Sequence, residues 1–341
     1  MAVIAVAGGT GNVGRTLVEA IVATGKHEVK ILARKANPEL EKKLGASIVV
    51  VDYADVGATT KILEEHNVHT VISAINMMPP PGETPLEFEL IRAADASAST
   101  KRMISSGWGV PHNESQGSQL GSVPNKLRAA ALLKETKDLE YTVVHNGFFL
   151  DYWATPIVPS YMSPFTLFID IPGNAAAIPG SGNTPSAFTH TKDVGKFVAA
   201  ALDLDKWEPD TFIVGDKVTF NQFVQLAEAA KGTKFNVAYD SVEKLKTGQT
   251  TELPSQVPAY QFFPKEAYQG MASVFGLWFE NGSFDIPPAG KKTLNQIFPD
   301  IKAWTGTGIY KFEIQMNLCI FMEVQKLEAQ HVPNPQWRKC I

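Results

Sequence analysis

A glycine-rich segment close to residue 1 constrains the fold more than any other feature. The apolar run of residues 2–6 leads into Gly-x-x-Gly-x-x-Gly spacing, and an amphipathic stretch over residues 15–22 follows. Strand, glycine turn and helix in this order form a dinucleotide-binding unit, in which Gly8 permits the tight turn, Gly11 admits a pyrophosphate and Gly14 lets the helix approach the strand. Free N–H groups and the positive end of the helix dipole then face the anion. We therefore expect a dinucleotide to be bound by Gly8, Thr10, Gly11, Asn12, Val13 and Gly14.

Short β-like runs alternate with helical stretches through the first half of the chain. Strands are expected over Val3–Ala7, Val29–Ala33, Ser47–Val51, Thr70–Ala74, Arg102–Ser105 and Tyr141–His145. Helices are expected over Val13–Ala23, Pro38–Leu44, Thr59–Glu65, Leu86–Ala96 and Asn125–Glu135. This rhythm predicts an α/β fold of the Rossmann type, a doubly wound parallel sheet with ligands beyond the carboxyl ends of its strands.

The pattern changes after Gly147, and we place the end of the dinucleotide-binding domain at residue 150, so that it covers residues 1–150. A helix over Lys192–Leu202 and a strand over Thr211–Val214 are expected to return to that domain. Residues 151–308 otherwise predict a smaller α+β, substrate-binding part, with helices over Phe220–Ala230 and Tyr260–Phe279, the second closing a pocket. Residues 309–341 do not fit this pattern, and no role is assigned to them.

Composition and charge narrow the function classes. Of 341 residues, 44% are hydrophobic and 19% charged, so the chain can bury a large core, and its net charge of -4 argues against a nucleic-acid partner. Cys319 and Cys340 show neither a disulfide framework nor metal-ligand spacing. No apolar run of about 18 residues predicts a membrane helix, and a strand beginning at residue 2 leaves no room for a cleavable signal. We expect a cytoplasmic protein without a metal. A homodimer is one possible oligomeric state, which the sequence leaves open.

The end of the second expected strand bears on the choice of cofactor. Arg34 and Lys35 stand about 20 residues after Gly14, where an acidic residue would bond the ribose 2′-hydroxyl of NAD. Because guanidinium pairs well with phosphate, this position favours NADP (NADPH). The alternative is an ordinary solvated Arg-Lys pair. Asp52 and Tyr53, which end the third strand, either border the adenine or form a turn.

Several segments together resemble the isoflavone-reductase-like and NmrA-like family of atypical short-chain dehydrogenase/reductases. Lys101–Gly109 is similar to that family's K-R-F-x-P-S-E-F-G, with Ser105 and Gly107 in place of its Pro and Glu. The resemblance extends over residues 2–304 and is also carried by Asn125–Arg128, Leu139–Phe149, Phe188–Gly195, Phe279–Gly282 and Leu294–Pro299. The Tyr-x-x-x-Lys pair of ordinary short-chain dehydrogenases is missing, because Ser122 stands four residues before Lys126. The resemblance therefore implies a catalytic site centred on Lys126.

Lys126 has a physical reason to be reactive. Near the start of a helix, it would face the positive end of the helix dipole, and apolar surroundings would lower its pKa further. Such a lysine serves as a general acid or base near neutral pH, or bonds the ribose hydroxyls. The alternative is a solvated helix lysine.

Other candidates follow the fifth and sixth expected strands. We expect Asn146 near the nicotinamide, and Ser106, Trp108 and Phe148 at the substrate, although a turn serine and a core aromatic are the alternatives. His112 is a weaker candidate for the pocket lining, and His145 for a proton relay.

These features together predict an NADPH-dependent reductase of a small, aromatic or polycyclic metabolite, with Lys126 delivering or relaying the proton. Two alternatives stay open: a redox-neutral isomerase or rearrangement enzyme on the same scaffold, and a non-catalytic NADP-binding regulatory sensor.

Overall fold

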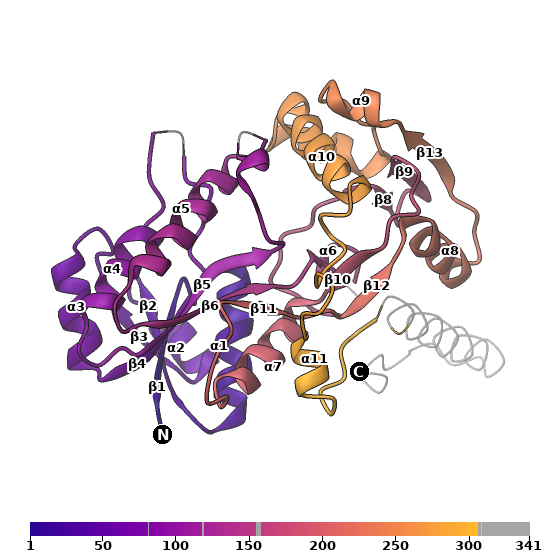
Figure 1. Cartoon of the computed structure of the whole chain (residues 1–341). Helices are drawn as coiled ribbons and strands as arrows, with labels where there is room; N and C mark the ends of the chain where they lie inside the picture. The colour runs from indigo at the N-terminus through magenta and orange to yellow at the C-terminus, as the bar shows by residue number, and fades with distance from the viewer. Residues whose placement is uncertain (81, 118, 155–157, 306–307, 309–341) are drawn as a thin grey trace, which may run out of the picture.

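The first part of the molecule is built on a seven-stranded parallel sheet (Figure 1). The computed structural model describes residues 1–80, 82–117, 119–154, 158–305 and 308; Cys319, Cys340 and the rest of 309–341 lie outside the described residues. The strand order is β11-β6-β5-β4-β1-β2-β3, and all neighbours are parallel. The strands are β1 (Val3–Ala7), β2 (Glu28–Ala33), β3 (Ser47–Val50), β4 (Val68–Ser73), β5 (Arg102–Gly109), β6 (Glu140–His145) and β11 (Asp210–Phe212). The order reverses between β1 and β4, where ligands bind in doubly wound folds.

Helices cover both faces of this sheet, which confirms the predicted fold class. The alternation of side chains along β1 divides the core, because Ile4 and Val6 pack on one face and Ala5 and Ala7 on the other. The first face carries α1 (Asn12–Thr24), α2 (Pro38–Leu44) and α7 (Thr191–Ala201). The second carries α3 (Val56–Glu65), α4 (Glu87–Ala96) and α5 (Ser122–Glu135).

The second part of the molecule combines two three-stranded sheets with further helices (Figure 1). One sheet has the order β12-β10-β7 and the other β13-β9-β8. The strands are β7 (Phe148–Phe149), β8 (Ile169–Asp170), β9 (Ala175–Pro179), β10 (Ser186–Thr189), β12 (Asp216–Val218) and β13 (Asn236–Asp240). The helices are α6 (Asp151–Ala154), α8 (Phe220–Lys231), α9 (Val242–Lys246), α10 (Lys265–Glu280) and α11 (Leu294–Ile297).

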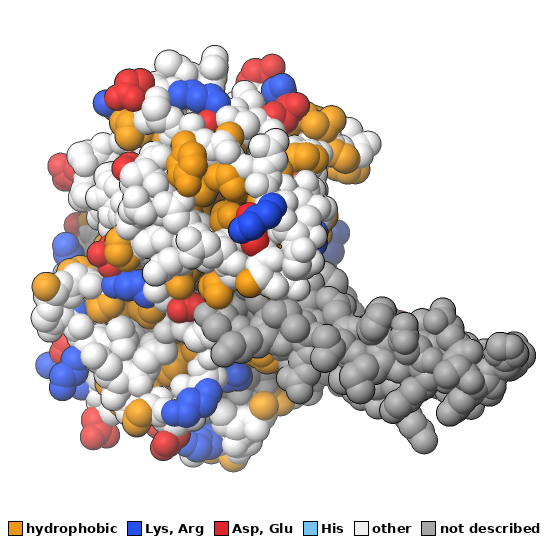
Figure 2. Space-filling model, turned by 90° about the vertical axis from the view of Figure 1, so that its right-hand side faces the viewer, with side chains coloured by type: hydrophobic (Ala, Val, Ile, Leu, Met, Phe, Trp, Pro, Cys, Tyr) orange, Lys and Arg blue, Asp and Glu red, His pale blue; other side chains and the backbone are white. Residues whose placement is uncertain are grey.

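Aromatic rings dominate the core of this second part, where Phe188, Phe220 and Phe279 pack against one another. Figure 2 views the molecule from the side of the second part and shows positive and negative side chains interspersed over that face. After this part the chain returns to the sheet, where α11 lies beside α7. No helix within the described ranges is both long and apolar enough to cross a membrane.

Three of the differences from the predicted element boundaries bear on the site. The segment over residues 260–279 is not one helix: a 3₁₀ helix ends at Gln261, and α10 begins at Lys265, directly after Pro264. Proline fixes its own φ and lacks an N–H donor, so it stands at the helix start rather than inside it. Helix α5 begins at Ser122, and β5 continues to Gly109, because its final residue pairs with His145 of β6.

Candidate functional site

The glycine turn packs as its sequence predicts. Gly8 has a φ of 74°, in the left-handed region that favours glycine. A Cβ at Gly14 would lie 2.1 Å from the carbonyl oxygen of Gly8, so Gly14 is required for the close approach of α1. The N–H of Gly11 donates to that same oxygen at 2.9 Å, which closes the turn.

A cavity of about 570 Å³ opens beside this turn, and we call it the turn cavity. Its lining includes Gly8, Thr10, Gly11 and Arg34, which brings four predicted dinucleotide-binding residues together. Tyr53 also lines it, donating to the carbonyl of Leu32 at 2.7 Å and accepting from the N–H of Gly8 at 3.4 Å. Burial raises the pKa of the Tyr53 phenol, so the group stays neutral.

The other predicted cofactor residues occupy different positions. Lys35 and Asp52 are exposed and outside the lining of the turn cavity. Asp52 instead accepts from the N–H of Ala54, as a turn residue does. Val13 packs against the core of the first part, and Gly14 is buried. Asn12 lines a second cavity, described next.

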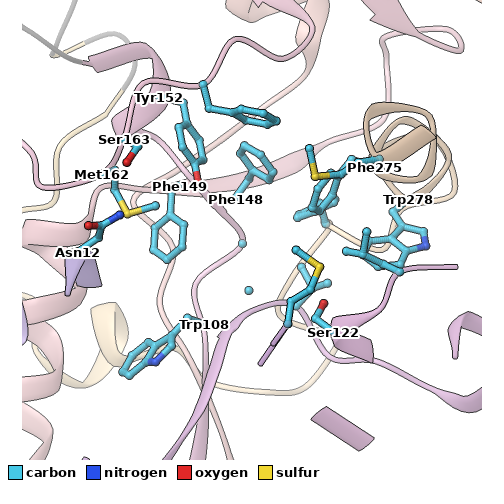
Figure 3. Close-up of a pocket in the computed structure, with 18 of the residues that line it drawn as sticks. Asn12, Trp108, Ser122, Phe148, Phe149, Tyr152, Met162, Ser163, Phe275 and Trp278 are labelled. Carbon is cyan, nitrogen blue, oxygen red and sulfur yellow. The ribbon is translucent and has the colours of Figure 1, made fainter. Parts of the chain in front are cut away.

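This second cavity, the aromatic cavity, has a volume of about 420 Å³ and lies between the two parts of the molecule. Figure 3 shows Asn12 and Met162 on one side of it, Phe275 and Trp278 on the other, and Trp108 below. Trp108 and Phe148 were predicted from the sequence and line this cavity. Further lining residues are Ser122, Phe149, Tyr152, Ser163, Phe165, Phe263 and Met271.

Lys126 also lines the aromatic cavity, and β5 bulges next to it. Ser105 pairs with Val143 and Gly109 with His145, so β5 has two more residues than β6 between these pairs. Gly107 lies within the bulge, where a Cβ would lie 2.2 Å from Cγ1 of Val143. The carbonyl oxygen of Gly107 accepts a hydrogen bond of 2.5 Å from Nζ of Lys126.

Burial lowers the pKa of Lys126 to about 8. The prediction that the helix dipole would contribute is wrong, because α5 begins at Ser122 and Lys126 falls in its second turn. The dipole acts mainly within the first turn. With a pKa of about 8, amine and ammonium are both populated near neutral pH, as a proton donor requires.

Two predicted residues do not reach the aromatic cavity. Ser106 is buried, and its hydroxyl donates to the carbonyl of Ile75 at 2.7 Å. Asn146 is fully buried and outside the lining of both cavities, and its backbone N–H donates to Gly109 at 2.9 Å. Ser106 and Asn146 therefore belong to the packing around β5 and β6 and not to the lining of the aromatic cavity.

A buried carboxyl also supports β5. Glu87 of α4 accepts hydrogen bonds from the hydroxyls of Ser73 and Ser105 and from the N–H of Ser106. These contacts tie the end of β4 to the middle of β5. Burial raises the pKa of Glu87, because the ionised form loses hydration that the three donors replace only in part.

Met271, Phe275 and Trp278 of α10 line the cavity, in agreement with the prediction that residues 260–279 close a pocket, although sequence analysis did not single out Met271 and Phe275. Their spacing of four and then three residues places them on one face of α10. This spacing can be read from the sequence, but it does not indicate which residues that face of α10 contacts. His112, a weaker candidate, lines the cavity and packs against Trp278 with ring centroids 5.2 Å apart. No metal-binding cluster of His, Cys, Asp or Glu occurs within the described part of the chain.

Comparison with known proteins identifies the family. The sequence profile of the NmrA-like family matches residues 1–308. The chain belongs to the NmrA-like family. It is 38% identical to oxidoreductase BOA1 of Botryotinia fuckeliana over 299 residues, which cover 87% of this chain and 95% of that protein. It is 30% identical to oxidoreductase swnN of Metarhizium robertsii over 329 residues, 89% of this chain and 94% of that one.

Solved structures share the fold. The binary complex of leucoanthocyanidin reductase with NADPH from Vitis vinifera aligns with a TM-score of 0.67 at 19% identity, covering 92% of this chain and 99% of that one. This likeness, together with the family match, confirms the resemblance drawn from residues such as Lys101–Gly109.

Proposed function

We propose that the protein is an NADPH-dependent reductase of a small, uncharged, aromatic or polycyclic metabolite, with Lys126 as the proton donor. The observation that carries the proposal is the position of the Lys126 amine in the wall of an aromatic cavity that reaches Asn12, directly after the glycine turn. Support also comes from the relatives named oxidoreductases and from the neighbouring structure with NADPH.

The residues of the turn cavity fit a dinucleotide phosphate. Gly8 and Gly11 offer backbone without Cβ atoms at the N-terminus of α1, where a pyrophosphate is stabilised. Arg34 at the end of β2 supplies a cation for a 2′-phosphate in the same cavity. NADPH bound there supplies a hydride to an electrophilic carbon of the substrate.

The cavity walls favour a flat, neutral substrate. Trp108, Phe149, Tyr152, Phe275 and Trp278 present apolar rings, and Lys126 is the only lysine, arginine, aspartate or glutamate among the described residues that line the cavity. Apolar pockets with a few convergent polar groups orient ligands by shape and position the reacting atom. Lys126 donates its proton to the oxygen, nitrogen or carbon of the substrate that gains electrons.

The test measures consumption of reduced cofactor with a panel of neutral aryl ketones, conjugated enones and cyclic imines. Oxidation of one NADPH per product, lost in Lys126→Ala, is the expected result. Conversion of substrate without NADPH oxidation would instead identify a redox-neutral rearrangement enzyme. Binding of NADPH without any conversion, together with a partner protein captured equally by wild type and Lys126→Ala, would identify a sensor.

A further inference from the structure

A third cavity lies behind Lys126, on the side of β5 and β6 that packs against α5. It has a volume of about 450 Å³, and we call it the rear cavity. Lys126, His112 and Val110 line both the rear cavity and the aromatic cavity, so they contribute to the wall between the two. His145 and Asp210 also line the rear cavity.

The His145 and Asp210 side chains lead from the rear cavity to solvent. Nε2 of His145 lies 2.8 Å from Oδ1 of Asp210. The His145 side chain is only 5% exposed, whereas that of Asp210 is 51% exposed. Nδ1 of His145 is buried and has no hydrogen-bond partner within the described residues. His145 thus lines a cavity large enough to hold several water molecules, and its Nδ1 has no hydrogen-bond partner among the described residues.

The proposed reduction consumes a proton in each turnover, and the rear cavity offers a route by which that proton is replaced. Each turnover of the proposed reaction removes one proton from Lys126, and the neutral amine must regain it before the next turnover. In the proposed reaction, nicotinamide and substrate would occupy the aromatic cavity and exclude water from it at the moment of proton transfer. Because Lys126 also lines the rear cavity, its amine can be reprotonated from that cavity.

We propose that the rear cavity is the proton entry path of the enzyme, in which His145, positioned by Asp210, passes protons through cavity water to Lys126. The turnover experiment described below rests on the proposed reductase function, whereas the proton-exchange experiment does not. The steps balance as proton transfers alone: the His145 imidazolium releases its Nδ1 proton to water and keeps its Nε2–H on Asp210, water protonates the Lys126 amine, and Nδ1 of the neutral ring regains a proton from solvent through cavity water.

The surrounding charges suit this role. Asp210 is held as a carboxylate, because its hydrogen bond with His145 keeps the pKa of Asp210 below its ordinary value. The carboxylate at Nε2 fixes the orientation of the ring. Lys134, Glu114 and Tyr141 line the same cavity, and Lys291 acts on Asp210 from the outside.

His112 has a different role in this path. Burial, with the nearby charge of Lys126 adding to it, lowers the pKa of His112 to about 4. The ring therefore stays neutral at physiological pH and serves as a partner for water rather than as a proton store.

The first experiment compares single and repeated turnovers in His145→Gln, whose side-chain amide can still donate to Asp210. Lys126 starts protonated, so the first turnover should keep the wild-type rate. Later turnovers should slow by on the order of 10- to 100-fold, the lower range of positioned proton transfer. Rapid mixing should thus show a burst of one NADPH oxidised per site, with KM unchanged and the slow phase accelerated by added imidazole. The control His66→Gln, at the C-terminal end of α3, should show no burst.

A second measurement does not depend on catalysis. NMR on the NADP⁺ complex with ¹⁵N-labelled lysine reports how fast the Nζ protons of Lys126 exchange with water, the signal being assigned by its loss in Lys126→Ala. Exchange should slow in His145→Gln and also in Ala130→Leu, which fills the rear cavity and leaves every titratable group in place. Circular dichroism checks that both variants are folded.

Unchanged exchange in both folded variants would overturn the proposal, even if Lys126 proves essential for turnover. Equal slowing of first and later turnovers in His145→Gln would also overturn it, because it would show a structural effect on the chemical step. Slowed exchange in a protein that oxidises no NADPH would keep the proton path and reject the reductase function.

Discussion

Burial in the wall of a cavity lowers the pKa of Lys126, so the pH dependence of turnover tests its role as proton donor. A proton donor must carry its proton, so turnover should fall as pH rises above about 8, the pKa of Lys126. Lys126→Ala should lower turnover by on the order of 10²–10⁴-fold and remove that alkaline limb. Lys126→Arg should not restore activity, since guanidinium does not deprotonate in this range. Steady-state rates over a pH series give the answer, and an unaltered limb in Lys126→Ala would assign it to another group.

Arg34 tests the choice between the two cofactors. It lines the turn cavity together with Gly8 and Gly11, whereas the neighbouring Lys35 does not. Arg34→Ala should weaken NADPH binding by about 1.5–3 kcal/mol, the range for a charge-assisted hydrogen bond, and leave NADH binding nearly unchanged. Lys35→Ala is the matched control and should have the smaller effect. Calorimetric titration with both cofactors measures this, and an unchanged preference in Arg34→Ala would refute the role.

Glu87 predicts a pH dependence of stability. Its folded-state pKa is raised above 4.5, so its contribution to the free energy of unfolding is complete below that pH and is lost as pH rises through the raised value. Glu87→Gln lacks this loss and keeps an oxygen that accepts from Ser105 and Ser106. Relative to wild type, the variant should therefore gain stability as pH rises from 4.5.

Urea unfolding at a series of pH values measures the difference between Glu87→Gln and wild type. Glu89→Gln, on the same helix with a side chain that pairs with Arg92, is the control. A difference that stays constant with pH in Glu87→Gln would show that Glu87 is not perturbed by burial.

At the scale of elements, substitutions in the turn between β1 and α1 distinguish a glycine needed for folding from one needed for cofactor binding. Gly14 has no room for a Cβ beside the Gly8 carbonyl, whereas a Cβ at Gly11 would meet that oxygen at 3.2 Å, which a small shift relieves. Gly14→Ala should thus destabilise the fold, by about 1–3 kcal/mol as overpacking does. Gly11→Val should keep the fold and lose NADPH binding, because its methyl groups fill the space for the pyrophosphate.

Thermal unfolding and cofactor titration of Gly11→Val and Gly14→Ala distinguish the two effects. Normal NADPH binding by a folded Gly11→Val protein would show that the phosphates lie elsewhere.

At the scale of the whole molecule, the cofactor should stabilise the fold. The turn cavity is lined by residues from Gly8 to Leu86, so NADPH would link β1, β2 and β4. A ligand at 100 times its Kd adds about 2.7 kcal/mol, and for a chain of this size about 2–4 °C per kcal/mol gives a rise in Tm of roughly 5–10 °C. NADH at the same concentration should give a smaller rise. Equal shifts in thermal denaturation would contradict the NADP preference.

The sequence determined the features that depend on neighbours along the chain. The alternation of β-like runs with helical stretches predicted a parallel sheet with helices on both faces, and the glycines from Gly8 to Gly14 predicted the turn, because left-handed backbone and missing Cβ atoms are local requirements. The basic end of β2 at Arg34 could be read for the same reason. Even the position of Lys126 in a helix was local information.

Only the tertiary structure decided the surroundings of these residues. Asn12, Trp108 and Trp278 meet in one cavity although they are far apart in sequence, and nothing in their local patterns specifies that contact. The bulge that points the Gly107 carbonyl at Lys126 arises from pairing between β5 and β6. For Lys126 the sequence predicted both a helix-dipole and an apolar contribution to the lowered pKa, but only the tertiary structure decided how far the amine is buried, because desolvation depends on everything that packs around a group and not on its place along the chain.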